Sequence, residues 1–286
     1  MWLVFAIGAA VFAGLTAVLA KIGLKNVDST LATALRTIVV VIFAFTMVLI
    51  VGSQTTIPDI SSKTFIFLIL SGIATGASWL CYYRALQMGD INKVVPIDKS
   101  SGVLTMLLAI IFLSEAFTPI KGVSMVLIAV GTYLMVEKKE PTNTDKKGNK
   151  WLMYAILSAL FASLTAILGK VGIEGVESNL GTFIRTVVVL IMAWLIVFGQ
   201  RKHKDIKKID RRSWSFILYS GLATGLSWLC FYRALQEGPA SVVVPIDKLS
   251  ILVTIAFGCT VFRERLGSKS AIGLIMIVTG TMFLLL

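Results

Sequence analysis

The sequence has little of what catalytic and metal centres are built from. Among its 286 residues there is a single histidine, His203, and there are three cysteines, Cys81, Cys230 and Cys259. No CxxC or Cys/His spacing occurs, and neither HExxH nor GxSxG is present; these patterns are typical of metal sites and of serine nucleophiles. We therefore expect no metal site, no cofactor and no disulfide framework. A membrane-embedded enzyme is the least favoured class of function.

Charged residues are also scarce. They make up 15% of the chain, while hydrophobic residues make up 57%, against about 25% and about 45–50% in soluble domains. This balance predicts an integral membrane protein whose surroundings are the lipid bilayer. The net charge is +12, but 12 of the 27 basic residues crowd into two loops, at 137–150 and 199–212, which is typical of topology signals. A nucleic-acid partner would need a soluble basic face, so none is expected.

One segment of the chain occurs twice. The sequence SGIATGASWLCYYRALQ at residues 71–87 returns as SGLATGLSWLCFYRALQ at residues 220–236, 149 positions later. The same offset relates Lys21 to Lys170, Arg36 to Arg185, PIDK at 96–99 to PIDK at 245–248, and Glu115 to Glu264. An internal repeat at a fixed offset indicates a duplicated structural unit. We expect a first unit at residues 1–137, a polar linker at 138–149 and a second unit at 150–286.

Each unit contains five apolar segments long enough to cross a membrane, which requires about 20 residues. The sequence thus predicts an all-α membrane protein with ten transmembrane helices. Because five is odd, the second unit would enter the membrane upside down, which gives two inverted five-helix repeats. The expected spans lie near residues 2–24, 30–52, 64–88, 94–113 and 119–136, and near 151–173, 179–199, 213–236, 242–262 and 268–286.

Loop charges support opposite orientations of the two units. The loop GSQTTIPDISSK of the first unit corresponds to GQRKHKDIKKIDRR in the second. Cytoplasmic loops collect Lys and Arg, so the linker and the loops at 199–212 and 263–269 are expected on the cytoplasmic face. Both termini are then expected outside a cell membrane that the chain crosses many times. A parallel repeat with an even number of spans is the alternative, and the change of loop charge argues against it.

Two fused five-span units with these sequences resemble the EamA-type branch of the drug/metabolite transporter superfamily. The resemblance is carried by the SG-ATG-SW-CYYRAL block, by the VVPIDK that follows it, and by the short turn holding Glu115 or Glu264. It implies secondary transport of small metabolites. It also implies that this chain is a fused pair of the single five-span units found in a bacterial subgroup. A functional monomer is expected, and a dimer stays compatible with the sequence. Many ten-span relatives begin with a basic tail, which this chain lacks.

Charged residues inside the expected spans are the first candidates for function, because each costs about 2.5–3.5 kcal/mol on insertion scales. Two interpretations stay open: long basic side chains near helix ends can snorkel to the headgroups, or the charges form two polar clusters, one at each mouth of a central cavity. Unit two favours the clusters, since its cations approach the external face, where basic residues are disfavoured. The candidates are Lys21, Arg36, Arg84, Asp98 and Lys99, and their counterparts Lys170, Arg185, Arg233, Asp247 and Lys248.

The two aspartates have two possible roles. Asp98 and Asp247 could form ion pairs with Arg84 or Lys21, or with the repeat counterparts, and so latch a gate. Alternatively, each could brace the start of its helix, since Pro96 and Pro245 would occupy the first turn and the helix dipole favours anions there.

Polar and aromatic residues deeper in the spans are candidates for substrate binding. They are Thr16, Ser78 and Trp79, with the counterparts Thr165, Ser227 and Trp228; Thr105 and Thr254 lie at a similar depth. Tryptophan usually marks the membrane interface, so a deep Trp beside a Ser favours the lining of a cavity over core packing. The GxxxG pairs at 72–76 and 221–225 favour close helix packing.

The leading hypothesis is a secondary transporter of a small organic metabolite that works by alternating access. Four bases to one acid in each cluster favour an anionic or zwitterionic solute over a simple cation. A flippase for an amphipathic or lipid-linked anion is the alternative. Without an ATP-binding motif in the sequence, a gradient or an exchange would drive either process.

Overall fold

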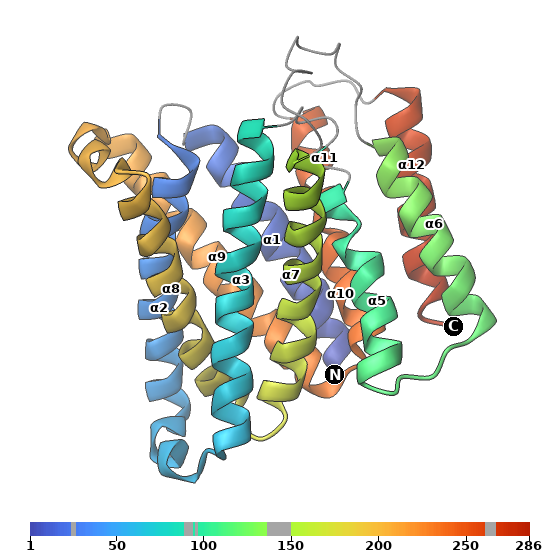
Figure 1. Cartoon of the computed structure of the whole chain (residues 1–286), viewed down its shortest axis with the longest axis horizontal. Coiled ribbons are helices and arrows are strands. Elements are labelled where there is room, and N and C mark those ends of the chain that lie inside the picture. Colours follow the sequence, from blue (N-terminus) through green and yellow to red (C-terminus); the bar gives the residue numbers. More distant parts are fainter. Residues whose placement is uncertain (24–26, 89–93, 95–96, 136–149, 261–266) are drawn as a thin grey trace.

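The structure is a computed structural model that describes residues 1–23, 27–88, 94, 97–135, 150–260 and 267–286. Within these ranges every regular element is a helix (Figure 1). The first half holds α1 (Trp2–Gly23), α2 (Ser29–Val51), η1 (Ser53–Asp59), α3 (Ser62–Met88), α5 (Ser101–Phe112) and α6 (Pro119–Met135). The second half holds α7 (Lys150–Ile173), α8 (Ser178–Gly199), η2 (Lys202–Lys208), α9 (Arg211–Glu237), α10 (Ala240–Lys248), α11 (Ser250–Thr260) and α12 (Ser268–Phe283).

The helices have the lengths and composition of membrane spans. Seven segments of the described chain are long and apolar enough to cross a bilayer, namely α1, α2, α3, α7, α8, α9 and the stretch from Ala240 to Thr260. Two further helices, α6 and α12, are apolar but shorter. The expectation of an all-helical membrane protein is therefore confirmed. The span expected at 94–113 falls partly on residues outside the described ranges, so the count of ten stays a prediction.

The span expected at 242–262 differs from the prediction. It begins at Ala240 and is interrupted at Leu249, which separates α10 from α11. Pro245 therefore lies in the interior of α10 and Asp247 near its C-terminal end. The expected place of Pro245 in the first helical turn was wrong, and with it the stabilisation of Asp247 by the N-terminal end of the helix dipole. Pro96, its counterpart, lies outside the described residues.

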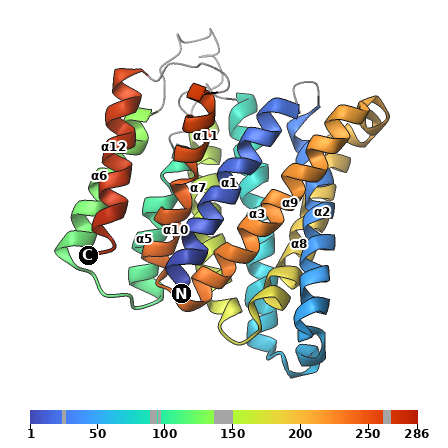
Figure 2. The same cartoon turned by 180° about the vertical axis from the view of Figure 1, so that it is seen from behind.

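The main helix contacts join one half of the chain to the other. Helix α1 packs on α9, α3 on α7, α2 on α8 and α6 on α12. Figures 1 and 2 show that α1 begins at the face that holds both termini, whereas α7 begins at the opposite face. Helices α1 and α7 thus run in opposite directions, and each packs on a long helix of the other half.

Small residues permit these close contacts. A Cβ atom on Gly72 would lie 2.7 Å from Cβ of Val188, and one on Gly221 would lie 2.6 Å from Cβ of Val39. Both glycines come from the GxxxG pairs, so the expectation of close packing there is confirmed. These contacts fix α3 against α8 and α9 against α2, and thereby place the polar residues that follow each glycine along the helix.

The turns after α2 and α8 are built alike. In each, a residue with positive φ, Gly52 at 77° or Arg201 at 58°, leads into a seven-residue 3-10 helix. Asparagine or glycine is more usual than arginine in this left-handed region. The two 3-10 helices, η1 and η2, are therefore structural equivalents in the two halves.

Candidate functional site

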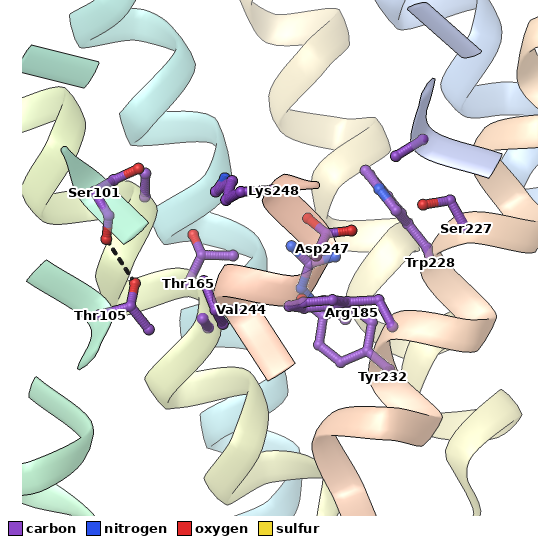
Figure 3. Close-up of a pocket in the computed structure, with 14 residues that line it drawn as sticks. Ser101, Thr105, Thr165, Arg185, Ser227, Trp228, Tyr232, Val244, Asp247 and Lys248 are labelled. Atoms are coloured by element: carbon purple, nitrogen blue, oxygen red, sulfur yellow. Dashed lines mark hydrogen bonds between the residues drawn. The ribbon is translucent and has the colours of Figure 1, made fainter. Parts of the chain in front are cut away.

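A cavity of about 210 Å³ lies among α1, α5, α7, α8, α9 and α10 (Figure 3). Both halves of the chain contribute to its wall, since α1 and α5 belong to the first half and the other four helices to the second. Polar, charged and aromatic side chains in the wall include Thr105, Thr165, Arg185, Trp228, Tyr232, Asp247 and Lys248.

Arg185 is the most unusual residue of the cavity wall. Its side chain comes from α8 and is only 3% exposed. Its Nε donates to Oγ of Ser71 at 3.0 Å, and Nη2 donates to Oγ1 of Thr75 at 2.6 Å. Both acceptors lie on α3, in the other half of the chain. Arg185 therefore joins the two halves through hydrogen bonds to neutral groups.

The guanidinium of Arg185 makes cation–π contacts with two aromatic rings. The Arg185 Cζ atom lies 5.2 Å from the centre of the Trp228 ring and 4.7 Å from that of Tyr232. Figure 3 shows both rings beside Arg185. Such cation–π contacts stabilise a desolvated cation by about 2 kcal/mol or more. Nη1 is buried without a hydrogen-bond partner. An unmade bond of this kind is costly, so a ligand that supplied an oxygen atom there would be favoured.

A hydroxyl network holds the acceptors of Arg185 in place. Ser71 donates to the carbonyl oxygen of Thr165 at 2.8 Å, and the hydroxyls of Thr75 and Thr165 lie 3.2 Å apart. Thr75 also donates to the carbonyl oxygen of Ser71 at 3.0 Å. Because α3 and α7 pack closely, these bonds fix the guanidinium of Arg185 in one orientation.

The two PIDK segments meet near this cavity. Lys99 lies within electrostatic range of Lys248, Asp98 and Asp247, and Asp98 accepts a hydrogen bond from Ser158 at 2.7 Å. Asp247 and Lys248 line the cavity itself. The sequence placed these four residues in two separate clusters, one for each unit; the structure brings them into one group of two acids and two bases.

The face at which α7 ends and α10 begins is closed by polar contacts. Nζ of Lys170 donates to the carbonyl oxygens of Gln236 at 3.2 Å and Gly238 at 3.1 Å. Nε2 of Gln236 donates back to the carbonyl oxygens of Ile173 at 2.6 Å and Val176 at 2.8 Å. Helices α7 and α9 are thereby tied together at their ends.

Glu115 adds a bond between the halves at the same face. Its carboxylate accepts from the backbone N–H groups of Ala240 at 2.6 Å and Ser241 at 3.1 Å, and also from the hydroxyl of Ser241. Nζ of Lys121 lies 3.9 Å away. Glu115 thus caps the start of α10, where N–H groups lack partners within the helix. In the sequence, Glu115 stood out only through the family resemblance, and this capping role was not predicted. The recurrence of Glu115 as Glu264 was the available signal.

The other expected site residues lie as follows. Thr165, Ser227 and Trp228 line the cavity, whereas Ser78 donates to the carbonyl oxygen of Ser158 at 3.0 Å. The hydroxyls of Thr16 and Thr224 are 3.2 Å apart, and Trp79 packs in the cluster around Leu31 and Ile217.

Among the remaining charged candidates, Nε of Arg233 forms an ion pair with Glu237 at 2.7 Å on the same helix. Arg36 is half-buried, and Arg84 is exposed and makes a contact of its own. The side chain of Lys21 lies outside the described residues. Sequence reasoning did not select Ser71, Thr75 and Tyr232; all three lie inside the repeated block, where their polar character was the only available signal.

Comparisons with known proteins agree with this architecture. The model of the EamA-like transporter family matches residues 1–137 and 149–286. The "Uncharacterized transporter in cobO 3'region" of Sinorhizobium sp is 42% identical over 134 residues, which are 47% of this chain and 95% of that protein. "Uncharacterized transporter YxxF" of Bacillus subtilis (strain 168) is 25% identical over 209 residues, 71% of this chain and 64% of that protein.

A solved structure titled "Crystal structure of protein" has the same fold. The two structures align with a TM-score of 0.78 at 14% sequence identity. The alignment covers 98% of this chain and 95% of the solved one. The first relative is matched over nearly its whole length by half of this chain, so its length corresponds to one of the two units.

Proposed function

Because this chain belongs to the EamA-like transporter family, and so is a multi-pass membrane transporter rather than an enzyme, we propose that the cavity beside Arg185 binds a small organic anion or zwitterion for transport. The transporter would be a secondary one, driven by a gradient or by exchange.

The observation that carries the proposal is the free donor of Arg185. Its Nη1 is buried without a partner in the wall of a cavity that a solute can occupy. A carboxylate or phosphate oxygen forms charge-assisted bonds with guanidinium that are roughly twice as strong as neutral ones. The aromatic faces of Trp228 and Tyr232 would then flank both the cation and its ligand.

The size of the cavity limits the size of the solutes that can bind. A volume of about 210 Å³ lies below the range of about 300–1,000 Å³ typical of drug-sized ligands. Asp247 and Lys248 in the same wall offer partners for one further positive or negative group. A small metabolite with one acidic group fits these limits better than a large amphipathic lipid.

Transport would proceed by alternating access between two inverted five-helix repeats, as in other transporters with this kind of duplication. Reciprocal packing of α1 on α9 and of α3 on α7 supports this arrangement. So does the opposite direction of α1 and α7 (Figure 1).

Differences between equivalent residues support a cycle with two states. Arg185 donates to Ser71 and Thr75. Within the part of the chain that the structure describes, no equivalent hydrogen bond joins Arg36 to Ser220 or Thr224. The threonines are otherwise alike, since the hydroxyl of Thr224 lies 3.2 Å from that of Thr16, as the hydroxyl of Thr75 does from that of Thr165. In the opposite state, we expect Arg36 to contact Ser220 and Thr224 and Arg185 to release its own partners.

Contacts of Lys170 and Glu115 would form the closed gate of the state described here. They lie where α7 ends and α10 begins, at the face that also holds both termini (Figure 1). If loop charges orient the chain as expected, this gate faces the outside. The counterparts of these two gate residues are Lys21, whose side chain is not described, and Glu264, which lies outside the described ranges.

A thermal-shift screen of the purified protein in detergent tests the proposal, since a bound ligand raises the apparent stability by mass action. Anionic, zwitterionic and cationic metabolites of matched size are compared on the wild type, on Arg185→Gln and on Arg233→Gln. We expect stabilisation by anions or zwitterions that is lost in Arg185→Gln and kept in Arg233→Gln, because Arg233 pairs with Glu237 instead of lining the cavity. Stabilisation by cations alone, or persisting in Arg185→Gln, would contradict the proposed site.

A further inference from the structure

Basic residues gather around η2, at the face opposite the two termini (Figure 1). Arg201, Lys204, Lys207 and Arg211 are exposed, and we call these four the η2 basic cluster. The neighbouring Arg212 is also exposed, and its guanidinium carbon lies 5.9 Å from the centre of the Phe216 ring. Two neighbours are held in ion pairs: Lys202 with Asp28 at 3.0 Å, and Lys208 with Asp205 at 2.8 Å. The hydrogen bond and the charge of Asp28 raise the pKa of Lys202.

The four residues of the cluster have no such partner. Among the residues that the structure describes, no ion pair joins an acidic group to any of them. The acids nearest in sequence are already engaged: Asp205 is paired with Lys208, and Asp210 accepts from the hydroxyl and the N–H of Ser213 at the start of α9. The cluster therefore presents uncompensated positive charge.

Comparison with η1 shows that the fold does not need these charges. Both 3-10 helices have seven residues, follow a residue with positive φ and end at an extended isoleucine, Ile60 or Ile209. At the positions of Lys204, Lys207 and Arg211, the first half has Thr55, Pro58 and Ser62. The same turn thus forms with and without the positive charge, so the charge serves a purpose other than folding of the turn.

Exposed aromatic side chains near η2 favour a position of this turn at the membrane interface. Ile206 and Ile209 pack inward on the cluster around Leu31. One turn further along α9, Trp214 is 41% exposed, and Tyr219 is exposed two turns on. Tryptophan and tyrosine are enriched at the headgroup level of membranes, so the basic cluster beside them lies where phosphate groups lie.

We propose that the η2 basic cluster is a binding surface for the headgroups of anionic phospholipids. A phosphodiester without a compensating cation, as in phosphatidylglycerol, supplies the negative charge that the four side chains lack. Juxtamembrane Lys and Arg clusters attract anionic lipids in this way. The proposal does not depend on which solute the cavity carries.

Lipid retention by the purified protein tests this directly. The full chain is equilibrated in detergent with equal amounts of phosphatidylglycerol and phosphatidylcholine, and the lipids that stay bound are counted by native mass spectrometry. Each Lys or Arg near a membrane surface changes the affinity roughly fivefold. The variant Lys204→Gln/Lys207→Gln/Arg211→Gln should thus lose the preference for phosphatidylglycerol, by up to on the order of a hundredfold.

A matched control removes three other exposed cations, in Lys63→Gln/Lys150→Gln/Lys269→Gln, and should keep the preference. Added salt should weaken it in the wild type, because exposed charges are screened. Equal retention of phosphatidylglycerol by the η2 variant and the wild type would overturn the proposal and leave the cluster as a topology signal.

A gain-of-charge variant keeps the test decisive if the η2 variant fails to fold. Thr55→Lys/Ser62→Arg places two of the charges at the equivalent turn, one on η1 and one at the start of α3. We expect this variant to retain additional phosphatidylglycerol relative to the wild type, by roughly fivefold for each added cation. No gain would overturn the inference that this turn, when charged, binds an anionic headgroup.

Discussion

Arg185 on α8 lies against Trp228 on α9, with its guanidinium carbon 5.2 Å from the centre of the indole ring. The arginine is buried, and its hydrogen-bonded partners are hydroxyl groups. A buried cation without a carboxylate costs several kcal/mol of desolvation, of which aromatic contact and two hydrogen bonds offset a part. The remaining cost makes the site favourable for an anionic ligand.

The first prediction concerns the shape of this cation. Arg185→Lys keeps the charge but loses the planar fork and the stacking on Trp228 and Tyr232. We expect the affinity for the ligand found in the screen to fall by about 10- to 100-fold, the equivalent of about 1.5–3 kcal/mol for bonds to a charged group. Isothermal titration in detergent measures it, with Arg233→Lys as the control that keeps the wild-type value.

An affinity that is unchanged in Arg185→Lys would mean that only a point charge is needed at this position. In that case the free Nη1 would not be the group that selects the ligand, and the site would be assigned to Lys248 instead.

The second prediction concerns the hydroxyl that orients Arg185. Thr75→Val removes the acceptor of Nη2 at 2.6 Å while the shape of the side chain is kept. We expect ligand affinity to fall about fivefold, as for the loss of one hydrogen bond of about 1 kcal/mol. Thr224→Val is the matched control, since Thr224 is the repeat counterpart and contacts Thr16; its effect should be smaller. A larger effect in Thr224→Val would show that the other half of the chain holds the ligand.

Much of the architecture was predictable because hydropathy and repetition are local signals. The expected spans at 30–52 and 179–199 correspond to α2 at Ser29–Val51 and α8 at Ser178–Gly199. The family resemblance, carried by the repeated block, is confirmed by the family model that covers both halves.

The break between α10 and α11 was not predictable in this way. Despite Asp247, Lys248 and Ser250 around the interruption at Leu249, the stretch from Ala240 to Thr260 keeps the mean hydropathy of one span. A hydropathy average reports how apolar a stretch is and does not detect a helix break at a single residue such as Leu249. For this reason Asp247 was expected at the start of its helix, whereas it lies near the end of α10.

The partners of Arg185 were beyond sequence reasoning for a different reason. Ser71 and Thr75 lie 114 and 110 residues away along the chain. Their meeting depends on how α3 packs against α7 and α8. Residue type alone marked Arg185 as a costly charge, but only the packing shows that one of its donors is left free.

The third prediction concerns the proposed gate. Glu115→Gln keeps the size of the side chain but removes the negative charge that accepts from Ala240 and Ser241 at the start of α10. Charge-assisted bonds are stronger than neutral ones by about 1–2 kcal/mol. We therefore expect the closed state to be less populated, by about 5- to 30-fold.

Cysteine labelling measures this effect without knowledge of the substrate. Thr105→Cys, in the cavity wall, is introduced into a chain whose own cysteines are replaced by serine. A membrane-impermeant maleimide is applied to oriented vesicles from the face that holds the termini. Glu115→Gln should speed labelling, whereas Asp59→Asn, which removes an exposed acid at the end of η1, should not. Equal rates in all three proteins would show that Glu115 does not control access to the cavity.

The fourth prediction concerns the pairing of α6 with α12, two apolar helices that are shorter than the other spans. A Cβ atom on Gly131 would lie 2.6 Å from the carbonyl oxygen of Gly273, and one on Gly273 would lie 2.5 Å from that of Gly131. Backbone atoms cannot move aside as a flexible side chain can, so Gly131→Ala must separate the helices. We expect a loss of about 1–3 kcal/mol, as for other overpacked contacts, visible as a lower midpoint in thermal unfolding.

Gly122→Ala on the same helix is the matched control. Its Cβ would lie 3.1 Å from the outer ring atom Cζ of Phe117, a side chain that is itself 62% exposed and free to turn away. Because alanine also favours a helix over glycine by about 1 kcal/mol, Gly122→Ala should be neutral or stabilising. If both variants unfolded at the same midpoint, the close approach of Gly131 and Gly273 would contribute nothing to stability. The two helices would then be held by the lipid around them and by their connections to the bundle.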